Sequence, residues 1–230
     1  MKRFRAVIHL LLVAFVVFMP VRALSQNSRY YIKESIEAWG KCRSVAISSY
    51  SGNMALTGHN SVAMQDLPEE LSLKLKEINL AKEYIEDVQI TDEGMWIVLY
   101  GGGRISHSIL PESLIKGMRR FRDAGEKITS VSFNDDGLWI ITSESHVLAS
   151  EQRVTKWLTE GFVDYGRLWS TCVTKYGVVA IYEGGYRYLG EIPDTLKAAL
   201  SSTKLNIYRL KIIEDAWFFA DRDGNYRYKM

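Results

Sequence analysis

Near its middle the chain reads Val131-Ser-Phe-Asn-Asp-Asp-Gly-Leu-Trp139-Ile-Ile-Thr, and two other stretches repeat this pattern. They are Val88-Gln-Ile-Thr-Asp-Glu-Gly-Met-Trp96-Ile-Val-Leu and Thr171-Cys-Val-Thr-Lys-Tyr-Gly-Val-Val179-Ala-Ile-Tyr. The turn glycine recurs at Gly94, Gly137 and Gly177, which are 43 and 40 residues apart. Self-similarity at this period is typical of stacked or circularly arranged units that bury their apolar faces against their neighbours.

Each repeat predicts three strands. A short strand is followed by a turn rich in Asp, Asn and Gly, in which glycine takes the positive-φ corner of a hairpin. The next strand is a continuous apolar run, which is typical of a strand buried on both faces. A second glycine-rich turn then leads into a third strand. By this pattern, units start near residues 43, 86, 129, 169 and 208.

Helices are predicted between the units. Pro68, Pro111 and Pro193 are each followed by an acidic residue and then by apolar residues at helical spacing, which predicts helices at residues 68–80, 111–123 and 193–201. In the third unit Ser150-Glu-Gln152 is the predicted helix cap. The fifth unit has no helix after it, and a short helix at residues 34–40 is predicted to supply the missing one.

This organisation resembles a β-propeller with three-stranded blades and a helix in place of the usual outer strand. It is similar to the exported, propeller-like repeat proteins of uncharacterised function found in bacteria, over residues 34–230. The predicted fold is therefore mainly β with helices, a closed ring of about five βββ units forming one domain at residues 26–230. The Asp-Gly-Trp turns also resemble the Asp-box turns of sialidase-type propellers, but their spacing is one residue short and such turns are structural.

The first 25 residues read as a secretory signal peptide. Lys2, Arg3 and Arg5 precede an apolar run at residues 6–19, and Ala23-Leu-Ser25 is a small-x-small cleavage site. The apolar run is shorter than the roughly 20 residues that a membrane span needs. The sequence thus predicts an exported protein, periplasmic or secreted, with no transmembrane span in the mature chain. A retained N-terminal anchor is the alternative.

The charge balance argues against nucleic acid as a partner. The whole chain has 29 Lys and Arg against 27 Asp and Glu. Loss of residues 1–25 removes four basic residues, and 25 against 27 gives the mature chain a net charge of −2. Nucleic-acid binding depends on clustered basic residues that neutralise phosphates. The one basic run, at residues 116–122, is interpreted as a solvated helix face.

No catalytic, metal or cofactor site is predicted. The prominent carboxylates all lie in the first turns of successive units, where turn formation explains them: Asp92, Glu93, Asp135, Asp136, Glu214 and Asp215. A glycosidase would need two carboxylates facing one another across a bound sugar. His59, His107 and His146 fall at different positions of their units. Cys42 and Cys172 could form a disulfide in an oxidising compartment or could both be buried thiols.

One further recurrence predicts a binding surface. Tyr186-Arg-Tyr188 and Tyr226-Arg-Tyr228 each follow a glycine-rich turn and are 40 residues apart. Tyrosine and arginine are enriched at binding hot spots, so Tyr186, Arg187, Tyr226 and Arg227 are the candidate binding residues. The alternative is cross-strand packing. The sequence favours a non-enzymatic exported scaffold with a protein or glycan partner. A glycan- or peptidoglycan-acting hydrolase and a structural module of an envelope assembly are the alternatives.

Overall fold

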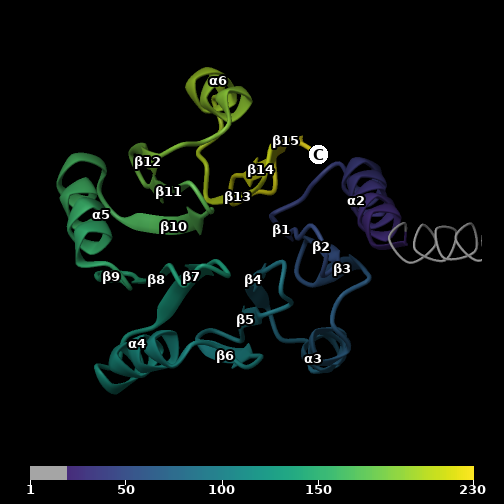
Figure 1. The fold of residues 1–230 in the computed structure, drawn as a ribbon, viewed down its shortest axis with the longest axis horizontal. Helices are drawn as coiled ribbons and strands as arrows, with labels where there is room; N and C mark the ends of the chain where they lie inside the picture. Colours follow the sequence, from purple (N-terminus) through teal and green to yellow (C-terminus); the bar gives the residue numbers. More distant parts are fainter. Residues whose placement is uncertain (1–19) are drawn as a thin grey trace, which may run out of the picture.

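The fold contains five three-stranded antiparallel sheets, each built from consecutive strands (Figure 1). The structure is a computed structural model that describes residues 20–230. The strands are β1 Ser44–Ala46, β2 Asn53–Thr57, β3 Ser61–Gln65, β4 Ile85–Ile90, β5 Trp96–Tyr100, β6 Arg104–His107, β7 Ile128–Phe133, β8 Trp139–Ser143, β9 Val147–Ala149, β10 Leu168–Val173, β11 Gly177–Tyr182, β12 Gly185–Gly190, β13 Arg209–Ile213, β14 Ala216–Ala220 and β15 Tyr226–Lys229. The predicted mainly β fold with three strands in each unit is confirmed.

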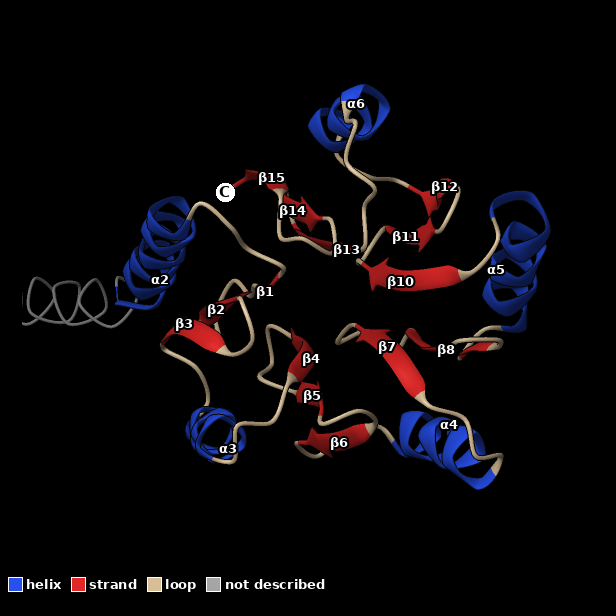
Figure 2. Cartoon of the chain, turned by 180° about the vertical axis from the view of Figure 1, so that it is seen from behind, coloured by secondary structure: helices blue, strands red, loops and turns tan. Residues whose placement is uncertain are grey.

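Within the described residues, one helix precedes each sheet, and the helices lie at the periphery of the molecule (Figure 2). They are α2 Pro20–Trp39, α3 Glu69–Leu80, α4 Glu112–Asp123, α5 Gln152–Tyr165 and α6 Asp194–Ser202. The predicted helix at residues 34–40 is therefore the end of a longer helix. The described part of this helix reaches back to Pro20, well upstream of the predicted start.

The proline signal located three helices correctly. Pro68, Pro111 and Pro193 immediately precede α3, α4 and α6, and all three have φ between −49° and −54° with ψ near 135°. Because this ψ is extended, the helix begins one residue after the proline instead of at it. The predicted cap of α5 is wrong in detail, since its N-cap residue is Glu151 and no side-chain hydrogen bond caps the helix.

Each helix between two units packs on the sheets before and after it. In the cluster around α3, Leu71 and Leu75 meet Leu56 of the first sheet and Val98 of the second. The middle strands β5, β8 and β14 are buried along their whole length, as their apolar sequences predict. Within residues 20–230, no strand pairing joins one sheet to the next. The units are therefore held together by side-chain packing.

Helix α2 has the same role between the last and first sheets. Ile36 packs in one cluster with Val45 of the first sheet and Phe218 of the last. The Tyr226 hydroxyl donates to the Ile36 carbonyl over 3.1 Å. In addition, the Cys42 amide donates to the Gly224 carbonyl over 2.9 Å. The two ends of the described chain thus lie side by side (Figure 1).

The predicted signal sequence falls largely outside the described residues, which start at Pro20. Among the helices that are described, none is long and apolar enough to cross a membrane.

Candidate binding site

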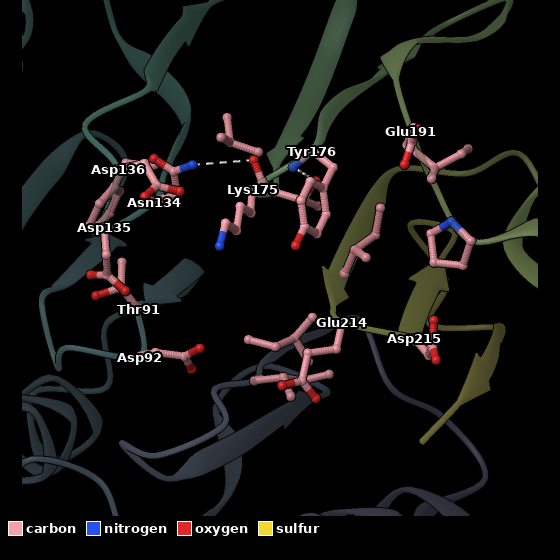
Figure 3. Close-up of a pocket in the computed structure, with 18 of the residues that line it drawn as sticks. Thr91, Asp92, Asn134, Asp135, Asp136, Lys175, Tyr176, Glu191, Glu214 and Asp215 are labelled. Carbon is pink, nitrogen blue, oxygen red and sulfur yellow. Dashed lines mark hydrogen bonds between the residues drawn. The ribbon is translucent and has the colours of Figure 1, made fainter.

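The first turns of the sheets surround a hollow of about 1050 Å³ (Figure 3). Its apolar lining includes one side chain from each unit, at or just after the end of the first strand: Ile47, Ile90, Phe133, Val173 and Ile212. The strand register supports the equivalence of three of these positions, because Ile90, Phe133 and Ile212 pair with Trp96, Trp139 and Trp217. The same repeat position therefore builds an apolar floor from five units.

The rim of this hollow is acidic. Seven carboxylates and two lysines line it: Asp92, Asp135, Asp136, Glu191, Asp194, Glu214, Asp215, Lys175 and Lys197. The formal charge of the lining is thus −5. Of the six carboxylates that the sequence places in the first turns, five line the hollow, Glu93 being the exception.

Cross-unit hydrogen bonds hold part of the rim in place. The Ser49 amide donates to Asp92 Oδ1, and Ser51 Oγ donates to the Asp92 carbonyl over 2.7 Å. The Glu93 amide donates to Asp135 Oδ2 over 3.3 Å. These contacts join the first turn to the second and the second to the third. Asp92 and Asp135 therefore have a structural role as well as a charge.

Two further hydrogen bonds continue this series of contacts between neighbouring first turns, which forms a belt around the hollow. Asn134 Nδ2 donates to the Thr174 carbonyl over 3.2 Å, and Ser49 Oγ donates to Glu214 Oε1 over 3.2 Å. Among the described residues, no such bond joins the turns of the fourth and fifth units. At that junction the lining extends past Tyr176 to Pro193, at the start of α6.

Electrostatics at the rim favour a cation. Burial raises the pKa of Asp92 above its ordinary value, and the nearby carboxylates of Asp135 and Glu214 raise it further, against the hydrogen bond from the Ser49 amide and the charge of Arg29. Asp92 and Glu214 are neighbours in the lining (Figure 3), since Ser49 donates to both carboxylates. Arg29 lies 4.0 Å from Glu214 Oε2, and a second positive charge would relieve the remaining repulsion between the carboxylates.

Thr91 adds an unused hydrogen-bonding group. Its side chain lines the hollow next to Asp92, and only 5% of the residue is exposed. Within residues 20–230 its hydroxyl Oγ1 is buried and has no hydrogen-bond partner. Buried polar groups are nearly always paired, so an unpaired one that lines a hollow indicates a place for a bound group.

Deeper along the first strands lies a buried charge network. Asp87 Oδ2 lies 3.0 Å from Lys211 Nζ, and Asp87 Oδ1 accepts a hydrogen bond from Ser44 Oγ over 2.9 Å. Arg209 donates to the carbonyls of Trp169 and Thr129 over 2.9 and 3.1 Å. These contacts connect residues of all five units.

Asp87 remains ionised in this network. Burial alone would raise the pKa of Asp87, but Lys211 and Arg209 outweigh that effect and hold the pKa below its ordinary value. The sequence reading missed these groups, although the signal was present. Each of Asp87, Arg209 and Lys211 is a charged residue next to a buried apolar neighbour in its strand, Val88 or Leu210.

The residues predicted to bind from the Tyr-Arg-Tyr motifs are not brought together. The hairpin before Tyr186 has two turn residues, since Tyr182 pairs with Gly185, whereas the hairpin before Tyr226 has five, since Ala220 pairs with Tyr226. The motifs nevertheless take equivalent places in their sheets. Arg187 pairs with Ala180, which packs with α5, and Arg227 pairs with Phe219, which packs with α6. Each arginine therefore faces the helix that precedes its own sheet.

Each of these four residues contacts a helix next to its sheet. Arg187 donates to the Trp157 carbonyl of α5 over 2.9 Å, with its guanidinium carbon 5.1 Å from the centre of the Trp157 ring. Arg227 donates to the Ala199 carbonyl of α6 over 3.3 Å. Tyr186 packs on the α6 cluster, and Tyr226 bonds to α2. Both arginines thus bond to the helix before their sheet, and binding by these four residues stays a prediction.

The cysteines and histidines form no reactive centre in the described part of the chain. Cys42 and Cys172 are both free and buried. Burial raises the pKa of Cys42 to about 12 and that of Cys172 to about 11, so both stay protonated at neutral pH. His146 Nδ1 lies 2.7 Å from Glu126 Oε1 at the surface. No group of three potential metal ligands occurs within residues 20–230.

Comparison with known proteins gives no further assignment. No protein-family model matches the chain, and no curated protein shows significant similarity to it.

Proposed function

We propose that the chain is an exported, non-enzymatic scaffold whose five units close into a propeller-like ring, and that it binds a protein or glycan partner at the acidic hollow. Support for closure comes from the two ends, because α2 packs between the first and last sheets. Support also comes from the buried charge network, in which Arg209 and Lys211 of the last sheet bond to residues of the second, third and fourth units.

The hollow carries the binding proposal. It is at the upper end of the size range of ligand sites, which are typically about 300–1,000 Å³ with apolar walls and a few convergent polar groups. An apolar floor with a carboxylate rim fits this description. The hydrogen bonds between neighbouring turns hold Asp92, Asp135 and Glu214 in position before a partner arrives, which lowers the cost of ordering them on binding.

Export is part of the same proposal. It rests on the basic, apolar and small-residue segments that succeed one another in the first 25 residues. Fractionation of cells expressing the full chain tests it. N-terminal sequencing of the exported form should start at Gln26, and a protein that stays in the cytoplasm with Met1 intact would refute export.

A hydrolase is the second candidate, because one observation favours it. Asp92 has a raised pKa next to other carboxylates, which is the environment that enzymes use for a general acid. Against this role, Asp92 Oδ1 already accepts the Ser49 amide as part of the rim. Release of reducing ends from peptidoglycan, abolished by Asp92→Asn, would favour the hydrolase over the scaffold.

Peptide and glycan arrays test the binding proposal. The test variant is Asp92→Asn, Asp135→Asn, Glu214→Gln, which removes three charges while each new amide oxygen can still accept the same hydrogen bond. The matched control neutralises three exposed carboxylates that do not line the hollow: Glu70→Gln, Asp123→Asn and Glu160→Gln. We expect array binding by the wild type and the control but not by the hollow variant. Equal binding by all three proteins would refute the hollow as the site.

A further inference from the structure

We propose that the ligand of the hollow is an extended peptide segment that inserts a lysine or arginine side chain among Asp92, Asp135 and Glu214. This inference rests on the proposed binding function and names its ligand class. The first reason is charge, since the lining carries seven carboxylates and two lysines. Lys197 Nζ lies 2.8 Å from Asp194 Oδ1 and Arg29 lies 4.0 Å from Glu214 Oε2, which leaves the other five carboxylates of the lining against Lys175.

The apolar floor of the hollow favours a lysine or arginine side chain over a hydrated metal ion. Ile90, Phe133 and Val173 line the hollow together with the carboxylates, each with at most 5% of its surface exposed. A lysine or arginine side chain combines an apolar methylene stem with a charged end, so its stem can lie on the floor while its head meets the rim. A hydrated metal ion would gain nothing from this floor. Moreover, no three potential metal ligands gather at one point in the described part of the chain.

Thr91 provides a specific partner for the cation. Its unpaired, buried hydroxyl oxygen can accept a hydrogen bond from an ammonium or guanidinium group. The rim then neutralises the remaining charge. Hydrogen bonds to charged groups contribute more than neutral ones, and pairing Thr91 removes the cost of a buried unsatisfied group.

The shape of the hollow at the junction between the fourth and fifth units favours an extended peptide as the ligand. There the belt of turn contacts is interrupted within the described residues, and the hollow continues past Tyr176 to Glu191 and Pro193. Tyr176 is 67% exposed at this edge. A peptide backbone can leave the hollow along this path, with the tyrosine ring as a flat apolar contact. A compact cation would leave this part of the lining unused.

Fluorescence anisotropy with two labelled peptides tests the inference on the full chain. The probes are acetyl-Ser-Leu-Lys-Leu-Ser-amide and the same peptide with norleucine in place of lysine, which keeps the methylene stem and removes the charge. We expect at least about tenfold weaker binding of the norleucine peptide. The lysine peptide should lose a similar factor with the triple hollow variant but not with the matched control, and its affinity should fall as salt is raised.

Thr91→Val separates ligand binding from a structural role. Because the hydroxyl has no partner in the fold, its replacement by a methyl group should leave the urea midpoint unchanged or raise it. Binding of the lysine peptide should nevertheless weaken several-fold. A lower midpoint with unchanged binding would overturn the role of Thr91 as a ligand contact.

Two further outcomes distinguish this inference from the proposed function. Equal affinity for the lysine and norleucine peptides, or preferential binding of spermidine or deacetylated chitotriose, would overturn the peptide inference. The scaffold proposal would survive that outcome, provided that the array ligands still depend on the hollow. If the hollow variant changes the binding of no probe and no array ligand, both proposals are wrong.

Discussion

Asp87 illustrates how a single residue links several units. It is 3% exposed and faces two buried cations, Lys211 and Arg209. Removing one partner of a buried charge network is costly, because the remaining charges keep their desolvation penalty without compensation. The network therefore makes the arrangement of the units depend on one carboxylate.

We predict that Asp87→Asn lowers the free energy of unfolding by about 3–5 kcal/mol. Urea melts should show this, whereas Asp123→Asn, which changes an exposed carboxylate on α4, should stay within about 0.5 kcal/mol of the wild type. Similar midpoints for the two variants would contradict the role of the network.

The pH dependence of the stability of the wild type and of Asp87→Asn gives an independent check. The folded-state pKa of Asp87 is lowered, so its stabilisation is present above the ordinary aspartate pKa of about 3.9 and is lost as the pH falls through the lowered value. The stability difference between wild type and Asp87→Asn should therefore shrink in acid.

Trp139 is a residue whose role the sequence predicted correctly. Trp96, Trp139 and Trp217 share one repeat position, and each is at most 5% exposed. Trp139 Nε1 also donates to Ser113 Oγ of α4 over 3.1 Å. The recurrence predicted a core position because only a buried site selects a large aromatic side chain repeatedly.

We predict that Trp139→Ala lowers the free energy of unfolding by about 3–5 kcal/mol through the cavity it leaves. Asp135→Ala, four residues earlier in the exposed turn, should cost much less, since its one cross-unit bond is a 3.3 Å contact at the surface. Urea midpoints of the two variants decide this, and equal midpoints would refute the core role of Trp139.

At the scale of elements, local signals predicted where helices and strands lie but not which side chains meet. Proline followed by acidic residues located α3, α4 and α6 because both features act within the first turn. The Tyr-Arg-Tyr repeat marked equivalent strand positions, because each arginine bonds to the helix that precedes its own sheet. The sequence did not reveal which helix carbonyls the arginines would meet, since these lie about 30 residues earlier in the chain.

Helix α5 shows a contact that no local signal could reveal. Gly161 lies within this helix, where glycine is unfavourable by up to about 1 kcal/mol relative to alanine. A Cβ atom at this position would lie 2.2 Å from Tyr182 Oη. The Tyr182 hydroxyl donates to the Leu158 carbonyl over 2.9 Å, which fixes the ring against the helix. The glycine therefore permits close packing of α5 on β11.

We predict that Gly161→Ala destabilises the protein by about 1–3 kcal/mol, despite its better helix propensity, because the added methyl group overpacks the interface. Glu160→Ala, one residue earlier on the exposed side of α5, is the control and should be near neutral. Tyr182→Leu should relieve most of the clash, so the double variant should cost less than the sum of the two single changes in thermal melts. Additive costs would contradict the proposed contact.

At the scale of the whole molecule, the period of the repeat predicted five units and their approximate starts. The hollow could not be predicted from it. Its floor requires that residues such as Ile47 and Ile212, far apart in the chain, converge at one end, and only the arrangement of the sheets brings them together. The turn carboxylates were recognised, but turn chemistry explained them locally, so their combined charge around one hollow became evident only from the fold.

Helix α2 provides the most direct test of the proposed ring, because it is contributed by the start of the chain and packs against its end. Deleting residues 1–40 removes Ile32 and Ile36 and uncovers Val45 and Phe218. We predict that the chain starting at residue 41 unfolds at a much lower urea concentration and binds a dye that reports exposed apolar surface. A chain starting at residue 26 should keep the full stability. Ile36→Ala, which removes buried contacts and leaves the helix in place, should cost about 2–5 kcal/mol. If the chain starting at residue 41 melts at the same urea concentration as the one starting at residue 26, α2 does not join the two ends and the proposed closure is wrong.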